Sequence, residues 1–320
     1  MTAVVFATRD GARTLPAMLP RLLGLRAPPG GHRIVVVDNG STDATPALLR
    51  EAAAASTVPF AVLQEPRPGK NRALNRALPL VAEEPLVVLT DDDVLPEPDW
   101  LERLCAAAKA SPGADLFGGA IRPHWPGPMP RWIAEYGVPL GVVYSATDPG
   151  RAAGPVGADL VWGPNMAVRG TVLRAGHRFN EEVGPDAGSA AYGMGSETEL
   201  TTRLAHAGHR AVFVPDAVVG HLVRPEQLDE GWILGRAFRH GLGFFRYHPQ
   251  PARGRLPWVA GLPPRFAVTL AAHAAAAAVL RPLPPSRLRF QILWQAAWLY
   301  GATRHLRSAP ATIKHAPARP

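Results

Sequence analysis

The sequence PLVVLTDDD, residues 85–93, predicts a buried strand that delivers three carboxylates at its C-terminal end. In open α/β sheets, ligands bind at that edge. Three adjacent carboxylates repel one another, so a cation is their natural partner, and oxygen ligands suit Mg²⁺ or Mn²⁺. The alternative is an acidic surface turn leading into a helix near Trp100, with Asp99 as its cap.

The same pattern occurs twice earlier in the chain. Residues 33–37, RIVVV, are followed by DNGSTD and by a helix-like stretch 44–55, which Asp43 is placed to cap. Residues 3–7 likewise lead through TRDG into a helical stretch near 15–25. Three strand–loop–helix units predict an α/β fold with polar loops on one edge of a parallel sheet.

Six short segments follow one another in a fixed order within the first 225 residues. They are VVFATRD (4–10), VVDNGSTD (36–43), GKNRALN (69–75), LTDDD (89–93), GPNMA (163–167) and GSETEL (195–200). In this order they resemble the inverting nucleotide-sugar glycosyltransferases of family 2. The resemblance implies a GT-A, Rossmann-like α/β domain over residues 1–225, with a mostly parallel central sheet.

The resemblance also implies a nucleoside diphosphate sugar, expected to be UDP-linked, as the donor. Asp38 would accept from the base, Lys70 would lie near the base or the phosphates, and Asp91 would face the ribose. The residues expected to bind the donor are Thr8, Arg9, Asp38, Lys70, Asp91 and Asp92. No glycine-rich phosphate loop or dinucleotide fingerprint follows the first strand, which argues against an NTPase or a nicotinamide enzyme.

A divalent metal, Mn²⁺ or Mg²⁺, is the expected cofactor. By resemblance, Asp93 would hold the ion that bridges the two donor phosphates. His221, which follows the strand-like residues 211–219, could complete the metal shell, because a neutral imidazole is a good ligand. The alternative is that His221 is a structural histidine.

Inverting transfer is one displacement, so a single carboxylate must take the proton of the acceptor hydroxyl. By resemblance Glu197 holds the position of this base, in a Ser-Glu pair where the family usually has Glu-Asp. Glu199 stays open as an alternative base, and with Ser196 it could form a capping box at a helix start. The residues expected at the acceptor are Gly163, Asn165 and Glu199.

Two segments without a recognisable motif are expected to contribute to acceptor binding. The glycine-rich residues 184–195 before Glu197 predict a mobile acceptor loop. Residues 124–155 are expected to carry specificity for the sugar and the acceptor.

Charge divides the chain unevenly. Residues 1–224 contain 21 Lys and Arg against 23 Asp and Glu, whereas residues 225–320 contain 13 against 3. We therefore predict a catalytic domain, 1–225, and a basic, proline-interrupted helical extension, 226–320. The helical stretches expected in the extension are 231–247, 266–280 and 286–306, followed by a disordered end, 308–320.

The extension either caps the catalytic domain or also contacts an anionic membrane surface. The apolar run 266–280 is shorter than the ~20 residues that cross a bilayer. The stretch 286–306 is typical of a basic amphipathic helix, with Trp294, Trp298 and Tyr300 as possible interfacial anchors. Specific nucleic-acid binding is not expected, since a basic patch alone supplies only non-specific attraction to phosphate.

The remaining features predict a cytoplasmic location. A peripheral position at the cytoplasmic face of the inner membrane is the alternative. The chain enters its first strand without a signal peptide, and its single cysteine, Cys105, permits no intrachain disulfide. The expected function is metal-dependent, inverting transfer to a hydroxyl of a glycan, a lipid-linked acceptor or a small molecule. Polysaccharide or cell-envelope glycan biosynthesis is the expected setting. The alternative from another class is a catalytically silent nucleotide-sugar-binding module.

Overall fold

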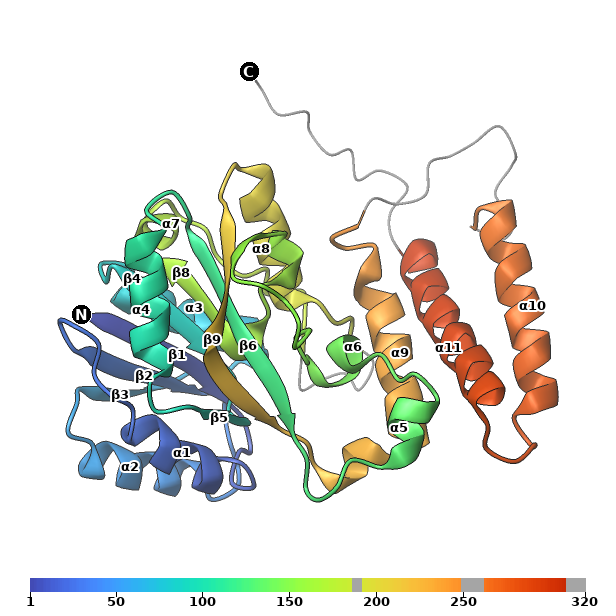
Figure 1. The fold of residues 1–320 in the computed structure, drawn as a ribbon, viewed down its shortest axis with the longest axis horizontal. Coiled ribbons are helices and arrows are strands. Elements are labelled where there is room, and N and C mark those ends of the chain that lie inside the picture. Colours follow the sequence, from blue (N-terminus) through green and yellow to red (C-terminus); the bar gives the residue numbers. More distant parts are fainter. Residues whose placement is uncertain (186–191, 249–261, 309–320) are drawn as a thin grey trace.

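The computed structural model describes residues 1–185, 192–248 and 262–308, and a nine-stranded sheet forms its centre (Figure 1). The strand order is β3-β2-β1-β4-β8-β6-β9-β5, and β7 pairs with β9. The strands are β1 (Thr2–Thr8), β2 (His32–Asp38), β3 (Phe60–Gln64), β4 (Leu86–Thr90), β5 (Val94–Pro96), β6 (Leu116–His124), β7 (Gly154–Val156), β8 (Met166–Arg169) and β9 (Ala211–Leu222). The three strands predicted from the sequence are thus confirmed as β1, β2 and β4.

The predicted α/β fold is confirmed, and the sheet includes antiparallel strands beside its parallel ones, β6 with β9 being a further parallel pair. Strands β1 to β4 pair in parallel. Strand β8 then runs antiparallel to both β4 and β6, and β9 is antiparallel to β5 and β7. The apolar runs predicted the parallel half well, because strands buried on both faces carry apolar residues on both sides.

Helices cover both faces of the sheet. One core packs β1, β2 and β4 against α1 (Leu15–Leu23), α2 (Thr45–Ala55) and α4 (Trp100–Ala110). The other core, made by the alternate side chains of the same strands, packs against α3 (Lys70–Val81), α7 (Gly170–Arg174) and α8 (Ser196–His206). The shorter helices are α5 (Arg131–Glu135), α6 (Leu140–Tyr144), η1 (Ala158–Leu160), η2 (Gly163–Asn165) and η3 (Pro225–Leu228).

The register of the sheet brings the predicted motifs to one edge. Thr8, the last residue of β1, pairs with Asp38, the last residue of β2. On the other side of β1, Phe6 pairs with Thr90, so Thr8 is level with Asp92 just beyond β4. Because parallel strands end at the same edge, three motifs far apart in the sequence meet there.

The C-terminal extension is helical, as predicted. It forms α9 (Glu230–Phe244), α10 (Pro264–Leu280) and α11 (Arg287–Ser308), which stand beside the sheet (Figure 1). Helices α9 and α11 cross closely because a glycine on each meets the backbone of the other. A Cβ at Gly241 would collide with the carbonyl oxygen of Trp298, and one at Gly301 would collide with that of Phe238. The predicted disordered end lies almost entirely outside the described residues.

Helix α11 is more deeply packed than an interfacial helix would be. Phe290 is 1% exposed and belongs to a cluster with residues of α5, α6 and α9. Of the three predicted membrane anchors, Trp294 and Trp298 pack on buried clusters, and Tyr300 alone is strongly exposed, at 50%. The anchor prediction was therefore wrong for the two tryptophans, because their rings fill the contact with the rest of the protein.

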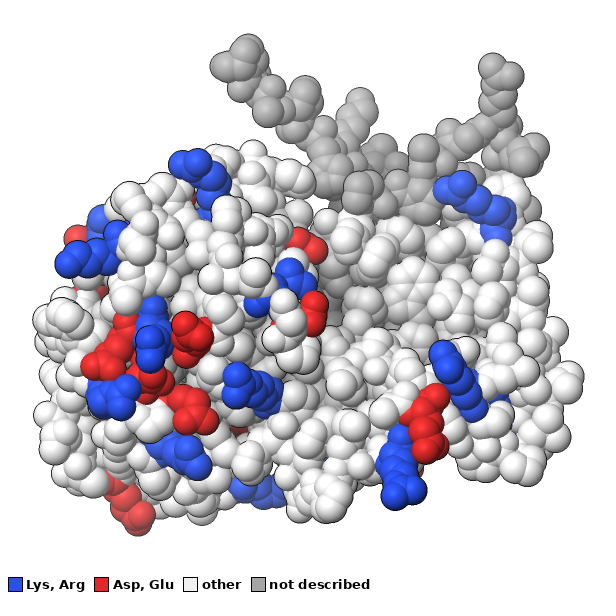
Figure 2. All heavy atoms as spheres, in the orientation of Figure 1, with Lys and Arg blue, Asp and Glu red and all other residues white. Residues whose placement is uncertain are grey.

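Helix α10 packs on α11 and buries none of its residues fully. In the face shown in Figure 2, charged side chains gather over the sheet, and the surface over the C-terminal helices is mostly uncharged. None of the helices in the described part of the chain is both long enough and apolar enough to cross a membrane.

Candidate active site

A cavity of about 720 Å³ lies between the C-terminal edge of the sheet and helices α6 and α9. Five of the predicted site residues line it from the sheet side: Lys70, Asp91, Asp93, Glu197 and His221. Gly163 also lines it. Helix α6, within the motif-free residues 124–155, and helix α9 supply the other walls. The sheet edge and the C-terminal extension therefore build one cavity together.

Lys70 joins two carboxylates at the centre of the cavity. Its Nζ donates to Asp91 Oδ1 at 2.5 Å and to Glu197 Oε1 at 2.7 Å. Burial opposes the ionisation of Glu197, but the Lys70 charge and hydrogen bonds from Lys70 and Ser196 outweigh it and lower the pKa of Glu197. Glu197 is therefore an ionised carboxylate that can accept a proton.

Gly163 provides the space that Glu197 occupies. A Cβ at Gly163 would lie 2.5 Å from Glu197 Oε1 and 2.7 Å from its Cδ, far inside ordinary contact distance. The predicted acceptor residue Gly163 thus lies directly against the predicted base. Its lack of a side chain is a steric requirement of this position.

The capping box predicted at the start of α8 is absent, and this prediction was wrong. Gly195, with φ of +103°, is the N-cap, so Ser196 is already inside the helix. Ser196 Oγ donates instead to Glu197 Oε2 at 2.7 Å. Glu199 forms a two-pronged ion pair with Arg203, at 2.6 and 3.0 Å.

Two of the three residues predicted at the acceptor do not reach the cavity. Glu199 is turned away from it by its pairing with Arg203. Asn165 is fully buried, where its amide bonds the carbonyl oxygens of Ala120 and Ala217, and its Oδ1 accepts from Trp100 Nε1. Since every polar atom of the Asn165 side chain is used within the protein, its role here is to tie strands β6 and β9 to helix α4.

Four of the predicted donor residues lie along the same edge, outside the walls of the cavity: Thr8, Arg9, Asp38 and Asp92. Thr8 Oγ1 donates to Asp92 Oδ2 at 2.6 Å. Burial, followed by repulsion from Asp93, raises the pKa of Asp92 to about 7. Asp38 accepts from the Ser41 backbone N–H at 3.0 Å. The structure thus brings these residues together beside the cavity.

Asp93 and His221 meet as the sequence predicts. Strands β5 and β9 pair Val94 with His221, which places Asp93 Oδ1 3.3 Å from His221 Nε2. The other ring nitrogen, Nδ1, is 2.8 Å from the Tyr144 carbonyl oxygen. Because a carbonyl can only accept, Nδ1 carries a proton, and Nε2 is the nitrogen directed at Asp93.

Asp93 and His221 could hold a divalent metal only if another molecule supplied further ligands. A carboxylate and an imidazole with a backbone carbonyl behind it form a typical ligand pair. Among the described residues, however, no group of three His, Cys, Asp or Glu side chains could hold an ion. Burial opposes the charge of Asp93, but His221 and Arg224 outweigh it and lower the pKa of Asp93 to about 2. Any metal here would need further ligands, such as donor phosphates.

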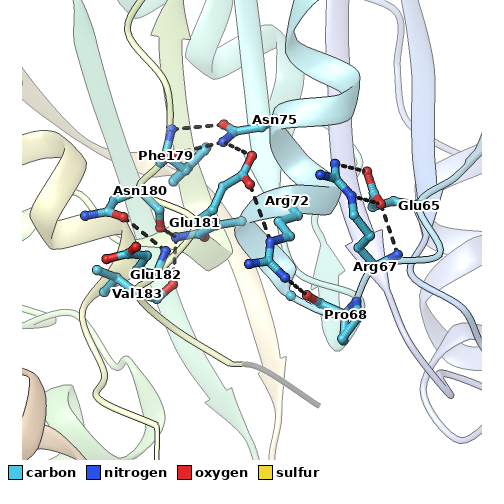
Figure 3. Close-up of polar contacts among 12 residues, drawn as sticks. Glu65, Arg67, Pro68, Arg72, Asn75, Phe179, Asn180, Glu181, Glu182 and Val183 are labelled. Atoms are coloured by element: carbon cyan, nitrogen blue, oxygen red, sulfur yellow. Dashed lines mark hydrogen bonds and ion pairs between the residues drawn. The ribbon is translucent and has the colours of Figure 1, made fainter. Parts of the chain in front are cut away.

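The segment before the predicted acceptor loop is fixed to α3 (Figure 3). Asn75 donates to the Phe179 carbonyl oxygen at 2.9 Å and accepts from the Phe179 N–H at 3.0 Å. Glu181 pairs with Arg72 at 3.4 Å and accepts from Asn75 at 3.2 Å. The chain is thus anchored on the helix that begins with Lys70. The centre of the predicted loop, 186–191, lies outside the described residues.

Sequence reasoning missed two groups of residues. Asn39 is 4% exposed, and its Oδ1 accepts from the Gly69 N–H at 2.8 Å, which fixes the turn before Lys70. Its place in the motif DNGSTD was a signal for this role. Arg224, Trp232, Arg236 and Arg239 line the cavity from the chain after β9. No motif marks them, since only the packing of α9 brings them there.

Comparison with known proteins shows similarity to glycosyltransferases, both in a family model and among curated relatives. Residues 3–135 match the family described as glycosyl transferase family 2. An uncharacterized glycosyltransferase of Mycobacterium tuberculosis is 35% identical over 138 residues, which cover 42% of this chain and 54% of the relative. The chain thus spans about half the length of that relative. The succinoglycan biosynthesis protein ExoM of Rhizobium meliloti is 26% identical over 244 residues, 75% of this chain and 74% of that protein.

Solved structures share the fold. The mannosyltransferase PcManGT of Pyrobaculum calidifontis, in complex with GDP-Man and Mn²⁺, has a TM-score of 0.62 at 24% identity, covering 95% of this chain and 86% of that one. TarS of S. aureus, in complex with UDP-GlcNAc, has a TM-score of 0.54 at 16% identity, covering 96% and 90%. At these identities the likeness concerns the fold alone.

Proposed function

We propose, from the match of residues 3–135 to glycosyl transferase family 2 and from the geometry of the cavity, that the chain transfers a sugar, with inversion, from a nucleoside diphosphate donor to an acceptor hydroxyl. One observation carries this proposal: an ionised carboxylate, Glu197, shares a cavity with the Asp93–His221 pair. Inverting transfer needs a base on one side of the anomeric carbon and a place for the departing diphosphate on the other.

Glu197 is the proposed base. The acceptor oxygen forms a bond to the anomeric carbon as the bond from that carbon to the diphosphate oxygen breaks. The hydroxyl proton passes to Glu197, and the bonding electrons leave with the nucleoside diphosphate. Lys70 supports this role, because its ammonium keeps Glu197 ionised. Lys70 also contacts Asp91, the residue expected to face the ribose of the donor.

Asp93 and His221 would hold a divalent metal, expected to be Mn²⁺ or Mg²⁺. When bound, such an ion would neutralise negative charge on the leaving diphosphate. Support comes from the ligand pair itself and from the neighbour described with GDP-Man and Mn²⁺. Arg224 Nη1, which lies 3.4 Å from Asp93 Oδ2, would add a positive charge on the same side.

Thr8, Arg9, Asp38 and Asp92 are proposed to receive the nucleoside of the donor, since they continue the same edge away from the cavity. A UDP-linked sugar is our expectation. The neighbours are described with GDP-Man in one case and UDP-GlcNAc in the other, so both nucleotides belong in the test.

We further propose an acceptor in polysaccharide or cell-envelope glycan biosynthesis, as the name of the Rhizobium relative suggests for that protein. The α10–α11 hairpin could contact an anionic membrane at its cytoplasmic face. Leu283 and Leu288 are 49% and 63% exposed at the hairpin turn, and Arg281 and Arg287 beside them are also exposed. No Asp or Glu follows Glu230 in the sequence.

Donor hydrolysis tests this function without knowledge of the acceptor. The full chain would be incubated with Mn²⁺ and a panel of α-linked UDP- and GDP-sugars, and the released sugar would be followed by NMR. We expect one donor to release its nucleoside diphosphate and to give the β-sugar first, before mutarotation. The α-sugar as first product would contradict inversion, and no release from any donor would contradict transferase activity.

A further inference from the structure

Two arginines stand side by side on the α9 wall of the cavity. The guanidinium carbon of Arg236 lies 5.6 Å from the centre of the Trp232 ring, and that of Arg239 lies 5.8 Å from it. Arg239 also lies 5.7 Å from the Tyr192 ring. Arg236 Nη2 donates to the Val142 carbonyl oxygen at 3.4 Å, and Arg236 also forms a side-chain hydrogen bond with Tyr192. Each guanidinium carries five N–H donors, so these contacts do not use up those of Arg236.

Neither arginine has an acidic partner within the parts of the chain that the structure describes. Their Nε atoms are buried and have no hydrogen-bond partner. Elsewhere, a half-buried arginine such as Arg289 is paired with a carboxylate, Glu230, at 2.6 Å. Two adjacent, partly buried cations that are not paired with a carboxylate are costly. Burial lowers the pKa of Arg236 and repulsion from Arg239 adds to this effect, while Tyr192 and Asp93 oppose it.

The neighbouring His240 adds another donor to this wall. Trp298 Nε1 donates to His240 Nδ1 at 3.2 Å, so that nitrogen is an acceptor. Burial and the nearby Arg236 lower the pKa of His240 to about 4, which leaves the ring neutral at pH 7. The single ring proton is then on Nε2. Arg236, Arg239 and His240 thus present hydrogen-bond donors, and the complementary ligand is an oxygen-rich anion.

The position of the two arginines indicates that they bind an anionic group of the acceptor and not of the donor. The diphosphate side of the cavity already has Lys70, Arg224 and the Asp93–His221 pair. Arg236 and Arg239 come from α9, a different element from those that carry the diphosphate-side groups, although Asp93 is near enough to favour the charged form of Arg236. An anion held there would belong to the molecule that enters the cavity after the donor.

We propose that Arg236 and Arg239 form an oxyanion site that recognises a phosphate or carboxylate group on the acceptor, close to the hydroxyl that is glycosylated. This inference rests on the proposed function, because only a transfer reaction brings an acceptor into the cavity. The planar guanidinium fork suits either oxyanion. A sugar phosphate and an acidic sugar are therefore the two sources to be distinguished.

Binding measurements test the proposal with three small sugars. The full chain, saturated with Mn²⁺ and with UDP or GDP, would be titrated with methyl β-glucoside, methyl β-glucuronide and glucose 1-phosphate. We expect one of the two anionic sugars to bind ~10–100-fold more tightly than the neutral one, as charged hydrogen bonds contribute. Whichever anion prevails identifies the source. Equal binding, or no binding, of all three sugars would overturn the proposal.

The variant R236Q/R239Q should abolish the preference for the anionic sugar. The exposed Arg287, outside the cavity, provides the matched control R287Q, which should keep it. Melting temperatures would show that both variants fold. If the double variant instead lost UDP or GDP affinity as strongly as anion affinity, the arginines would belong to the donor site, and the proposal would be wrong. The titration does not depend on catalysis, so a failure of donor hydrolysis leaves its outcome interpretable.

Discussion

The Lys70 ammonium donates a 2.7 Å hydrogen bond to the Glu197 carboxylate and so connects the first residue of α3 with the first turn of α8. The two residues are 127 positions apart in the chain. Lys70 also holds Asp91, so the base and the donor-side carboxylate share one cation. The charge states of Glu197 and Asp91 are therefore coupled through Lys70.

The variant E197Q should lower the transfer rate by ~10²–10⁴-fold, since an amide cannot accept the hydroxyl proton. Nucleoside diphosphate affinity, measured by calorimetry, should change little. The control is E199Q, because Glu199 pairs with Arg203 away from the cavity. A large loss in E199Q with a mild one in E197Q would show that the base is Glu199.

The variant K70M should shift the pH dependence of the reaction. Lys70 lowers the pKa of Glu197, so wild-type activity should persist until the pH falls through that depressed value. Without Lys70 the pKa of Glu197 rises, and activity should be lost at a higher pH. The acid limb of kcat/KM against pH measures this shift, whatever the change in absolute rate. An unmoved acid limb would mean that Glu197 is not the titrating base.

The variant G163A should disturb the base without removing it. The new Cβ would meet Glu197 Oε1 at 2.5 Å, so the carboxylate must move. A misplacement of about 1 Å can cost ~10²-fold in rate. G127A is the control, since a Cβ at Gly127 would meet nothing within 4 Å. Equal rates for the two alanine variants would argue against a fixed position of Glu197.

Metal removal should abolish activity, and D93A should reproduce the effect. A bound divalent ion contributes several kcal/mol of charge stabilisation, so we expect a loss of at least ~10²-fold in turnover. Mn²⁺ should no longer raise UDP or GDP affinity in D93A. Full wild-type activity in EDTA would contradict metal dependence.

D93A should also be somewhat less stable than the wild type. The pKa of Asp93 is lowered to about 2, so its ionised form stabilises the fold despite the neighbouring acids. That contribution is present above the ordinary pKa of an aspartate and is lost as the pH falls through about 2. Thermal melts at pH 7 should therefore show a lower Tm for D93A, and an unchanged or higher Tm would contradict this sign.

The full chain should co-sediment with anionic liposomes and not with neutral ones, and high salt should weaken the binding. Replacing Leu283 and Leu288 by serine should reduce binding, because both are exposed at the α10–α11 turn. The exposed Arg21 on α1 gives the control R21Q. Deleting α11 would be a poor test, since its packing on α9 is part of the fold. No sedimentation with either liposome type would leave α10 and α11 as a cap alone.

The sequence predicted the elements and the sheet edge because both follow from local patterns. Apolar runs gave β1, β2 and β4, and parallel strands necessarily bring Thr8, Asp38 and Asp92 to one edge. The partners of individual side chains were not predictable in this way. Glu199 meets Arg203 and does not line the cavity, and no motif around it marks that choice.

The α9 wall was beyond the reach of sequence reasoning for a different reason. Arg236 and Arg239 belong to an ordinary amphipathic helix, with no motif around them. Only the close crossing of α9 with α11 and the contact of α9 with α6 place them in the cavity. A separate set of long-range contacts, with β6, β9 and α4, takes Asn165, which lies in a family-like motif, out of contact with the cavity.

The glycine-mediated crossing of α9 and α11 has a consequence for truncated and chimeric forms of this protein. A shortened chain ending near residue 225 would keep the carboxylates at the sheet edge and lose the arginine-bearing wall. On the proposed assignment, such a chain would keep the donor-binding side of the cavity and lose the side that recognises the acceptor. Chimeras in which residues 226–308 are exchanged between related enzymes should therefore inherit acceptor preference from the C-terminal parent and donor preference from the N-terminal one.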